Sequence, residues 1–170
     1  FQAGSPGAWQ AAQEYADGQQ FMPVLTFWGG VGSGKSHLLQ AIGWKLLEHG
    51  VQVRYVFIPD FLADLRASLS ENADIPYQVI YRQLEDAQVL LLDDLGMEKA
   101  SAWTQEVTGR LIDRAWREAM PMVVATNCGA YAADRIDKLG RRVADRLFDT
   151  GSGRVRVVST GARSYRTGRL

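Results

Sequence analysis

The sequence of 170 residues contains one cysteine, Cys128, and two histidines, His37 and His49. A single cysteine excludes a disulfide framework within the chain. No pairing with histidine and asparagine supports a thiol mechanism, so we expect Cys128 to be a small buried residue. The histidines have no cluster of metal ligands around them, and neither is expected to bind a metal.

Long apolar runs are also absent. No run approaches the roughly 18 residues that a membrane span needs, and no signal peptide is visible. We therefore expect no membrane partner and, with one free cysteine, a reducing compartment such as the cytoplasm. The first residue is Phe1 rather than methionine, which suggests a fragment without its N-terminal region.

A net charge is missing as well, since 19 basic residues balance 19 acidic ones. This balance argues against a basic field over the whole molecule. The distribution is uneven, however: residues 134–170 carry a net charge of +6, and residues 1–133 carry −6. Such asymmetry suggests an anionic partner or a neighbouring acidic subunit for the C-terminal face. The alternative is an ordinary solvated helix face.

What is present fits one α/β domain with a real core. Short apolar runs alternate with segments of helical periodicity, which predicts a central parallel sheet covered by helices on both faces. The expected strands are 24–28, 51–58, 89–92, 122–126 and 155–158. The expected helices are 8–15, one after the glycine-rich segment from about His37 to about Glu48, one from Pro59 with Phe61, Leu62, Leu65 and Leu69 on one stripe, one from Pro76 with Val79, Ile80 and Leu84, 102–117, and 131–149 broken near Gly140. A loop is expected at 70–75.

The segment GGVGSGKS, residues 29–36, fits G-x-x-x-x-G-K-[S/T] between an expected strand and an expected helix. Glycines let backbone N–H groups form a concave anion site, and the helix N-terminus adds its dipole. Lys35 would then reach the β- and γ-phosphates of ATP or ADP, and Ser36 would bind Mg²⁺. The alternative is a glycine-rich turn without a ligand. The residues expected around the nucleotide are Gly29, Gly30, Val31, Gly32, Ser33, Gly34, Lys35, Ser36 and His37.

Polar side chains follow two further expected strands. Asp93 and Asp94 come after the apolar run 89–92, and Asn127 follows 122–126. At the carboxyl edge of the sheet, Asp93 would hold Mg²⁺ directly or through water, and Asp94 would polarise the attacking water. Asn127 would hydrogen-bond the γ-phosphate or orient water. Acidic and asparagine turns after strands are the alternatives.

The order of these parts resembles a AAA+ ATPase, and closely the DnaC/DnaI-type replicative helicase loaders. The matching segments are GGVGSGKSHLLQAI, LLLDDLGMEKASAWTQE, VVATN, RRVADRL and SYR, within about residues 24–166. The most specific part runs from Asp93 through Glu98 and Lys99 to Trp103. IstB-type transposition helpers share the P-loop and SYR, usually lack the Glu-Lys-Trp pattern, and rank second.

The resemblance implies a role for each matching residue. Lys35 and Ser36 fall in Walker A, Asp93 and Asp94 in Walker B, and Asn127 at sensor 1. Arg146 falls at the arginine finger, and Arg166 at sensor 2. Residues 59–86 correspond to the helical insertion that loaders use on single-stranded DNA. Phe61 and Tyr81 could stack on bases there, although core packing is the favoured interpretation of both.

As a whole, the resemblance implies that residues 1–170 form a single AAA+ ATP-binding domain, without the N-terminal helicase-binding region of loaders. Such a domain hydrolyses ATP, binds single-stranded DNA, assembles with copies of itself through the Arg146 face and delivers a ring helicase in DNA replication. Asp94 stands where many AAA+ proteins have glutamate, so turnover is expected to be slow and dependent on assembly. The alternatives are an IstB-like helper, an ATP-gated adaptor with negligible hydrolysis and a small-molecule kinase.

Overall fold

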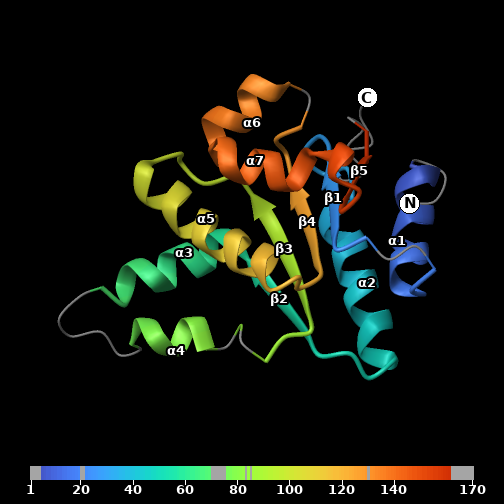
Figure 1. Ribbon diagram of the computed structural model, residues 1–170, viewed down its shortest axis with the longest axis horizontal. Helices are drawn as coiled ribbons and strands as arrows, with labels where there is room; N and C mark the ends of the chain where they lie inside the picture. Colours follow the sequence, from blue (N-terminus) through green and yellow to red (C-terminus); the bar gives the residue numbers. More distant parts are fainter. Residues whose placement is uncertain are drawn as a thin grey trace.

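The computed structural model describes residues 5–19, 22–69, 76–82, 84, 86–129 and 131–161. Five strands form one parallel sheet with the order β2-β3-β4-β1-β5. The sheet is covered by helices on both faces, which gives three layers (Figure 1). The predicted three-layer α/β fold is therefore confirmed. The strands are β1 Val24–Trp28, β2 Val53–Phe57, β3 Val89–Leu95, β4 Met122–Thr126 and β5 Val155–Ser159.

The helices divide between the two faces. On one face, α1 and α2 pack over Leu25, Leu91 and Val123, and on the other α3 to α7 pack over Leu92 and Val124. The two cores meet along alternate residues of β3 and β4, which explains why these strands are apolar throughout. The helices are α1 Pro6–Ala16, α2 Lys35–Glu48, α3 Ile58–Ala67, α4 Tyr77–Arg82, α5 Ala102–Arg117, α6 Ala132–Leu139 and α7 Arg141–Phe148, with a 3₁₀ turn η1 Thr150–Ser152.

Local sequence signals explain where several helices begin and end. Ser101 caps α5 in a capping box, because its hydroxyl accepts from the Thr104 N–H and Thr104 Oγ1 accepts from the Ser101 N–H. Gly140, at φ +79°, separates α6 from α7 at the predicted break. A buried hydroxyl fixes the end of α7 on the sheet, since Thr26 Oγ1 donates to the Leu147 carbonyl at 2.8 Å.

Some expectations about single residues were wrong. The stripe expected on α3 was extended too far, because the helix ends at Ala67 and Leu69 is 63% exposed. The helix from Pro76 was expected to include Leu84, but α4 ends at Arg82; Leu84 and Ile80 are buried, whereas Val79 is 41% exposed. Strand β3 continues through the two acidic residues to Leu95, with an irregularity between Leu92 and Leu95. The loop predicted at 70–75 lies outside the described residues.

Among the described residues, none of the helices is both long and apolar enough to span a membrane.

Replacing Leu91 by alanine should lower the free energy of unfolding by about 2–5 kcal/mol. Leu91 is 1% exposed in the centre of the sheet, and its loss leaves a cavity between β3 and α2. Urea denaturation followed by circular dichroism measures the change. The control Leu47→Ala, at a side chain that is 50% exposed, should cost no more than about 0.5 kcal/mol. Equal costs for both variants would contradict the packing described here.

Candidate nucleotide-binding site

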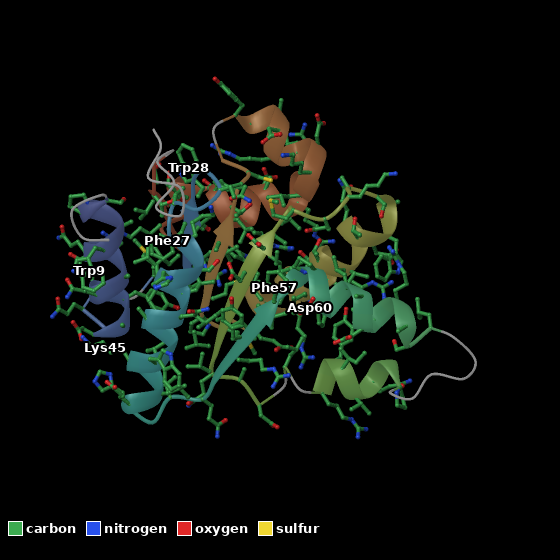
Figure 2. The ribbon with its side chains drawn as sticks, turned by 180° about the vertical axis from the view of Figure 1, so that it is seen from behind. Trp9, Phe27, Trp28, Lys45, Phe57 and Asp60 are labelled. Atoms are coloured by element: carbon green, nitrogen blue, oxygen red, sulfur yellow. The ribbon has the colours of Figure 1, made fainter. Side chains whose placement is uncertain are left out.

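The glycine-rich segment lies between β1 and α2, as predicted. Trp28 ends β1 at the edge of the sheet where this loop begins (Figure 2). Gly34 is the N-cap residue of α2 at φ +92°, a left-handed conformation that side chains disfavour. The loop therefore delivers the positive end of the helix dipole and its free N–H groups to one point. Val31 and His37 are exposed, whereas Ser33 is fully buried.

Lys35 folds back over its own loop. Its ammonium group donates to the carbonyls of Gly29 at 2.9 Å and Gly30 at 2.8 Å, and the residue is 5% exposed. Burial lowers the pKa of Lys35, while the nearby carboxylates of Asp94 and Asp93 act to raise it. Both bonds are made to neutral carbonyl oxygens, so phosphate oxygens that replaced them would bind the ammonium group more strongly.

Asp93 joins three elements at the carboxyl edge of the sheet. Its Oδ1 accepts from Ser36 Oγ of α2 at 3.1 Å and from the Asp94 N–H at 3.0 Å, and its Oδ2 accepts from the Tyr55 hydroxyl of β2. Asp93 is 2% exposed. Burial, followed by the bond to Asp93, raises the pKa of Tyr55, so this hydroxyl remains a donor. Sequence reasoning missed Tyr55, which carries no motif of its own.

The Ser36 and Asp93 oxygens fit a magnesium ion. Mg²⁺ prefers oxygen ligands and usually takes only one or two from the protein, with waters and substrate phosphates as the others. Within the part of the chain that the structure describes, no group of three or more His, Cys, Asp or Glu side chains could hold a metal ion. The Ser36 and Asp93 oxygens would leave most of the ligand positions of a Mg²⁺ ion to waters and phosphate oxygens.

The backbone after Asp93 is unusual. Asp94 has φ +57°, and Gly96 has φ +82°. A left-handed aspartate is uncommon outside turns, and such conformations cluster at functional sites. Glu98, which sequence reasoning did not assign to the site, accepts from the Gly96 N–H at 3.0 Å. Burial raises the pKa of Glu98, and its bond to Gly96 supports the turn that orients Asp94.

Asn127 follows β4, between the strands that carry the P-loop and Asp93. Thr126 fixes this end, because its hydroxyl donates to the Leu95 carbonyl at 2.7 Å and accepts from the Cys128 N–H at 3.0 Å. The Asn127 amide contacts Met97 Sδ. Cys128 is fully buried, as expected, and burial raises its pKa.

The end of β5 supports the P-loop through contacts that sequence reasoning missed. Thr160 donates from its N–H to the Trp28 carbonyl at 2.8 Å, and its hydroxyl lies 2.7 Å from Ser33 Oγ. The Gly30 N–H donates to the Gly161 carbonyl at 3.0 Å. A Cβ atom at Gly29 would meet Thr160 Oγ1 at 2.3 Å, so this approach requires glycine. Arg166, the sensor 2 candidate, lies outside the described residues.

Arg146 lies on α7, and its guanidinium forms an ion pair with Asp113 of α5. Arg142, one helical turn earlier, reaches the other oxygen of Asp113 at 2.7 Å. The side chain of Arg146 is 16% exposed and that of Arg142 is 72% exposed. Asp113 of the neighbouring helix is thus the partner carboxylate of Arg146 within its own subunit.

The two base-stacking candidates belong to the core. Phe61 is 7% exposed and meets the Tyr81 ring edge to face at a centroid distance of 5.8 Å. Tyr81 is partly buried and packs against the same core. The idea that Phe61 stacks on bases is therefore wrong for this conformation, because its ring faces other side chains.

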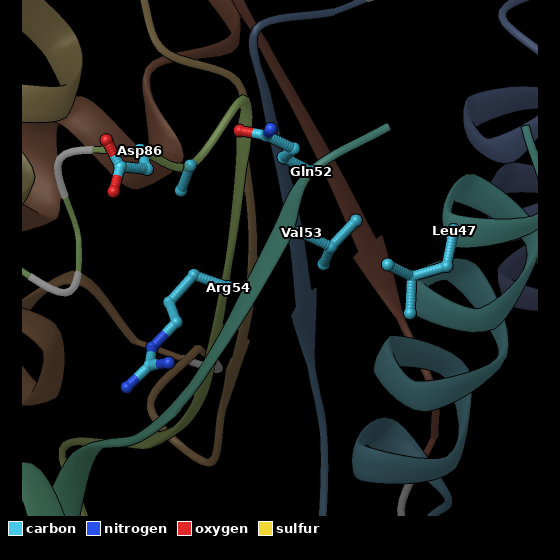
Figure 3. Close-up of a pocket in the computed structure, with 6 residues that line it drawn as sticks. Leu47, Gln52, Val53, Arg54 and Asp86 are labelled. Atoms are coloured by element: carbon cyan, nitrogen blue, oxygen red, sulfur yellow. The ribbon is translucent and has the colours of Figure 1, made fainter. Parts of the chain in front are cut away.

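An open hollow of about 620 Å³ lies elsewhere, at the amino ends of β2 and β3 (Figure 3). The side chains of Leu47 and Val53 point toward each other on one side of the hollow, and Arg54 and Asp86 line the opposite side. The P-loop follows the carboxyl end of β1, so this hollow lies at the opposite edge of the sheet. It is separate from the nucleotide site described above.

Comparison with known proteins identifies the family. The model of the bacterial DnaA ATPase domain matches residues 3–151. The chain belongs to this family. The replicative helicase loader DnaC of Buchnera aphidicola subsp. Schizaphis graminum is 26% identical over 139 residues, 81% of this chain and 56% of the loader. The chain therefore spans about half the length of the curated loaders that it matches, and the resemblance to helicase loaders is confirmed.

Solved structures agree on the fold. The crystal structure of the DnaC helicase loader superposes with a TM-score of 0.73 at 23% identity, over 89% of this chain and 87% of that one. The replication initiator DnaA bound to AMPPCP and single-stranded DNA gives a TM-score of 0.68 at 20% identity, over 89% of this chain and 44% of that one. At these identities, the likeness supports the predicted AAA+ architecture.

Lys35→Ala should abolish nucleotide binding while leaving the fold intact. Lys35 carries the only formal charge in residues 29–36, and a charged donor would bind phosphate oxygens strongly. The loop carbonyls that lose the ammonium group can accept from water. Calorimetric titration with ATP measures the affinity. Lys45→Ala, on the same helix, removes a lysine that pairs with Asp17 and should bind ATP normally. Unchanged affinity in Lys35→Ala would contradict the P-loop assignment.

Proposed function

We propose that this chain is an ATP-binding and ATP-hydrolysing module of the helicase-loader type, which acts with single-stranded DNA in replication. One contact carries this proposal: the Ser36 hydroxyl of the P-loop helix donates to the buried Asp93 carboxylate at 3.1 Å. This contact brings the start of the P-loop helix, where Lys35 lies, against a carboxylate within the buried strand β3. Membership of the DnaA ATPase-domain family supports the same reaction.

In the proposed reaction, loop N–H groups and Lys35 hold the phosphates of ATP. Ser36 and Asp93 would hold Mg²⁺, which when bound neutralises charge on the β- and γ-phosphates. Asp94 orients a water that attacks the γ-phosphorus. The bond from phosphorus to the bridging oxygen breaks, and ADP, phosphate and a proton leave. Asn127 would hydrogen-bond the γ-phosphate.

A second function is favoured by one observation. Asp94 is one methylene shorter than the glutamate of many AAA+ proteins and has a left-handed backbone at φ +57°. An ATP-gated adaptor that binds nucleotide and hydrolyses almost none would tolerate this geometry. A further alternative is that the chain is an IstB-like helper, which would act in transposition rather than in replication.

ATP turnover separates these functions when it is measured with and without single-stranded DNA across protein concentration. A loader-type ATPase should hydrolyse slowly, and its rate per subunit should rise with protein concentration and DNA. An adaptor should bind ATP without turnover. A constant rate per subunit that depends instead on a small-molecule acceptor would indicate a kinase and contradict the proposal.

We further propose that Arg146 acts in the nucleotide site of a neighbouring subunit. A guanidinium is permanently charged and can neutralise the leaving phosphate. Head-to-tail contacts of this kind give rings or open filaments. Within its own subunit Arg146 pairs with Asp113, so action on a neighbour requires that the guanidinium leave Asp113 or be shared with the phosphate. Arg142 also pairs with Asp113 and would keep that carboxylate compensated.

Arg146→Ala and Lys35→Ala proteins should each be inactive alone, and mixing them should restore some turnover. The Arg146→Ala subunit keeps its nucleotide site and borrows the arginine of its neighbour. A trans arginine contributes roughly 10³–10⁵ in rate in well-studied GTPases, and we expect at least about a tenfold loss here. Phosphate release under assembling conditions is the measurement.

The stability of Arg146→Ala must be checked, because breaking a buried ion pair can cost about 3–5 kcal/mol. Arg146→Lys keeps a positive charge beside Asp113 but loses the planar guanidinium that can bind two phosphate oxygens. This variant should therefore fold like wild type while its turnover remains low. Arg141→Ala, at an exposed arginine on the same helix, is the matched control. Wild-type turnover by Arg146→Ala would show that the assignment is wrong.

Binding to single-stranded DNA should be independent of sequence and should weaken steeply with salt. Residues 134–170 carry the +6 charge, and phosphate contacts release counterions. Fluorescence anisotropy with oligonucleotides of different sequence, in the presence of an ATP analogue, is the measurement. Affinity should fall at least about tenfold between about 50 and about 200 mM salt. Salt-independent affinity, or no binding, would contradict this prediction.

A further inference from the structure

Tyr55 contacts the nucleotide site from the edge strand β2. In the register of the sheet, Tyr55 pairs with Leu91 and Phe57 pairs with Asp93. Tyr55 therefore lies on the same face of the sheet as Asp93, two residues earlier along the strand direction. This is the face that carries α2 and Ser36. From there the Tyr55 hydroxyl reaches forward and donates to Asp93 Oδ2.

The two oxygens of Asp93 are held differently. Oδ1 accepts two bonds, from Ser36 Oγ and from the Asp94 N–H, whereas the bond described for Oδ2 comes from Tyr55. Ser36 Oγ is also the oxygen that fits a cation. The Ser36 hydroxyl has one donor hydrogen and two lone pairs, so it can donate to Asp93 Oδ1 and still offer a lone pair to a cation. Tyr55 holds the second oxygen, Oδ2, and the two sides together fix the plane of the carboxylate.

We propose that Tyr55 is a positioning residue for a divalent cation, and that it acts by holding Asp93 through Oδ2. The inference rests on the proposed ATPase function. Removing a group that hydrogen-bonds to a metal ligand and orients it typically weakens metal binding by about 10–100-fold. A purely structural tyrosine would bury its ring, but Tyr55 is 39% exposed, and its hydroxyl is bonded to a carboxylate that is 2% exposed. The contact is therefore made by the polar end of the side chain.

The test compares wild type with Tyr55→Phe, which keeps the ring and removes the hydroxyl. Mn²⁺ binding to the protein–ADP complex is followed by electron paramagnetic resonance, and ADP affinity is measured separately in EDTA. Tyr55→Phe should bind Mn²⁺ about 10–100-fold more weakly and should bind metal-free ADP like wild type. Tyr131→Phe, at an exposed tyrosine, is the matched control and should match wild type in both measurements.

Each outcome has one meaning. Mn²⁺ affinity in Tyr55→Phe that equals or exceeds that of wild type overturns the inference, because the hydroxyl would then be neutral or would compete with the metal. If wild type itself binds no ADP, the proposed function fails instead.

A second measurement keeps the inference testable if Tyr55→Phe does not fold. A 3-fluorotyrosine is placed at position 55, and its fluorine resonance should broaden in the Mn²⁺–ADP complex relative to the Mg²⁺–ADP complex. A resonance that keeps its width places Tyr55 away from the cation and also overturns the inference.

Discussion

The hydrogen bonds of the buried Asp93 carboxylate connect the parts on which the site depends. Asp93 ends the apolar part of β3 and accepts from Ser36 at the start of α2 and from Tyr55 on β2. Strand order makes this possible: β4 lies between β1, which leads into the P-loop, and β3. Because all five strands are parallel, their carboxyl ends meet at one edge. The proposed nucleotide site therefore lies over the end of β4, where Asn127 follows Thr126.

Much of this arrangement follows from local sequence patterns. Apolar runs and helical stripes predicted the five strands and the helices. The motif around Lys35 indicated that the candidate site lies at the carboxyl edge of the sheet. The break at Gly140 was also predictable, because glycine commonly ends a helix. In the structure Gly140, at φ +79°, ends α6 and precedes α7. Leu69 shows the limit of periodicity, since a stripe can continue in the sequence after the helix has ended at Ala67.

The supporting contacts could not be predicted, because they join residues far apart in sequence and depend on strand register. Tyr55 and Asp93 are 38 positions apart, and Ser33 and Thr160 are 127 apart. The same holds for Asp113, which neutralises Arg146 across two helices. In each pair, the sequence pointed to one residue, namely Asp93, Ser33 or Arg146. The residue that contacts it could be identified only from the fold. The roles assigned to Lys35, Asp94, Asn127 and Arg146 stay predictions.

A crystal structure with Mg²⁺ and a non-hydrolysable ATP analogue tests the central claim most directly. Lys35 should then leave the carbonyls of Gly29 and Gly30 and bond to phosphate oxygens, with the cation beside Ser36 and Asp93. A nucleotide bound elsewhere, for example in the hollow beside Leu47 and Val53, would contradict the account. So would a Lys35 ammonium group that keeps both carbonyl bonds while the nucleotide is present.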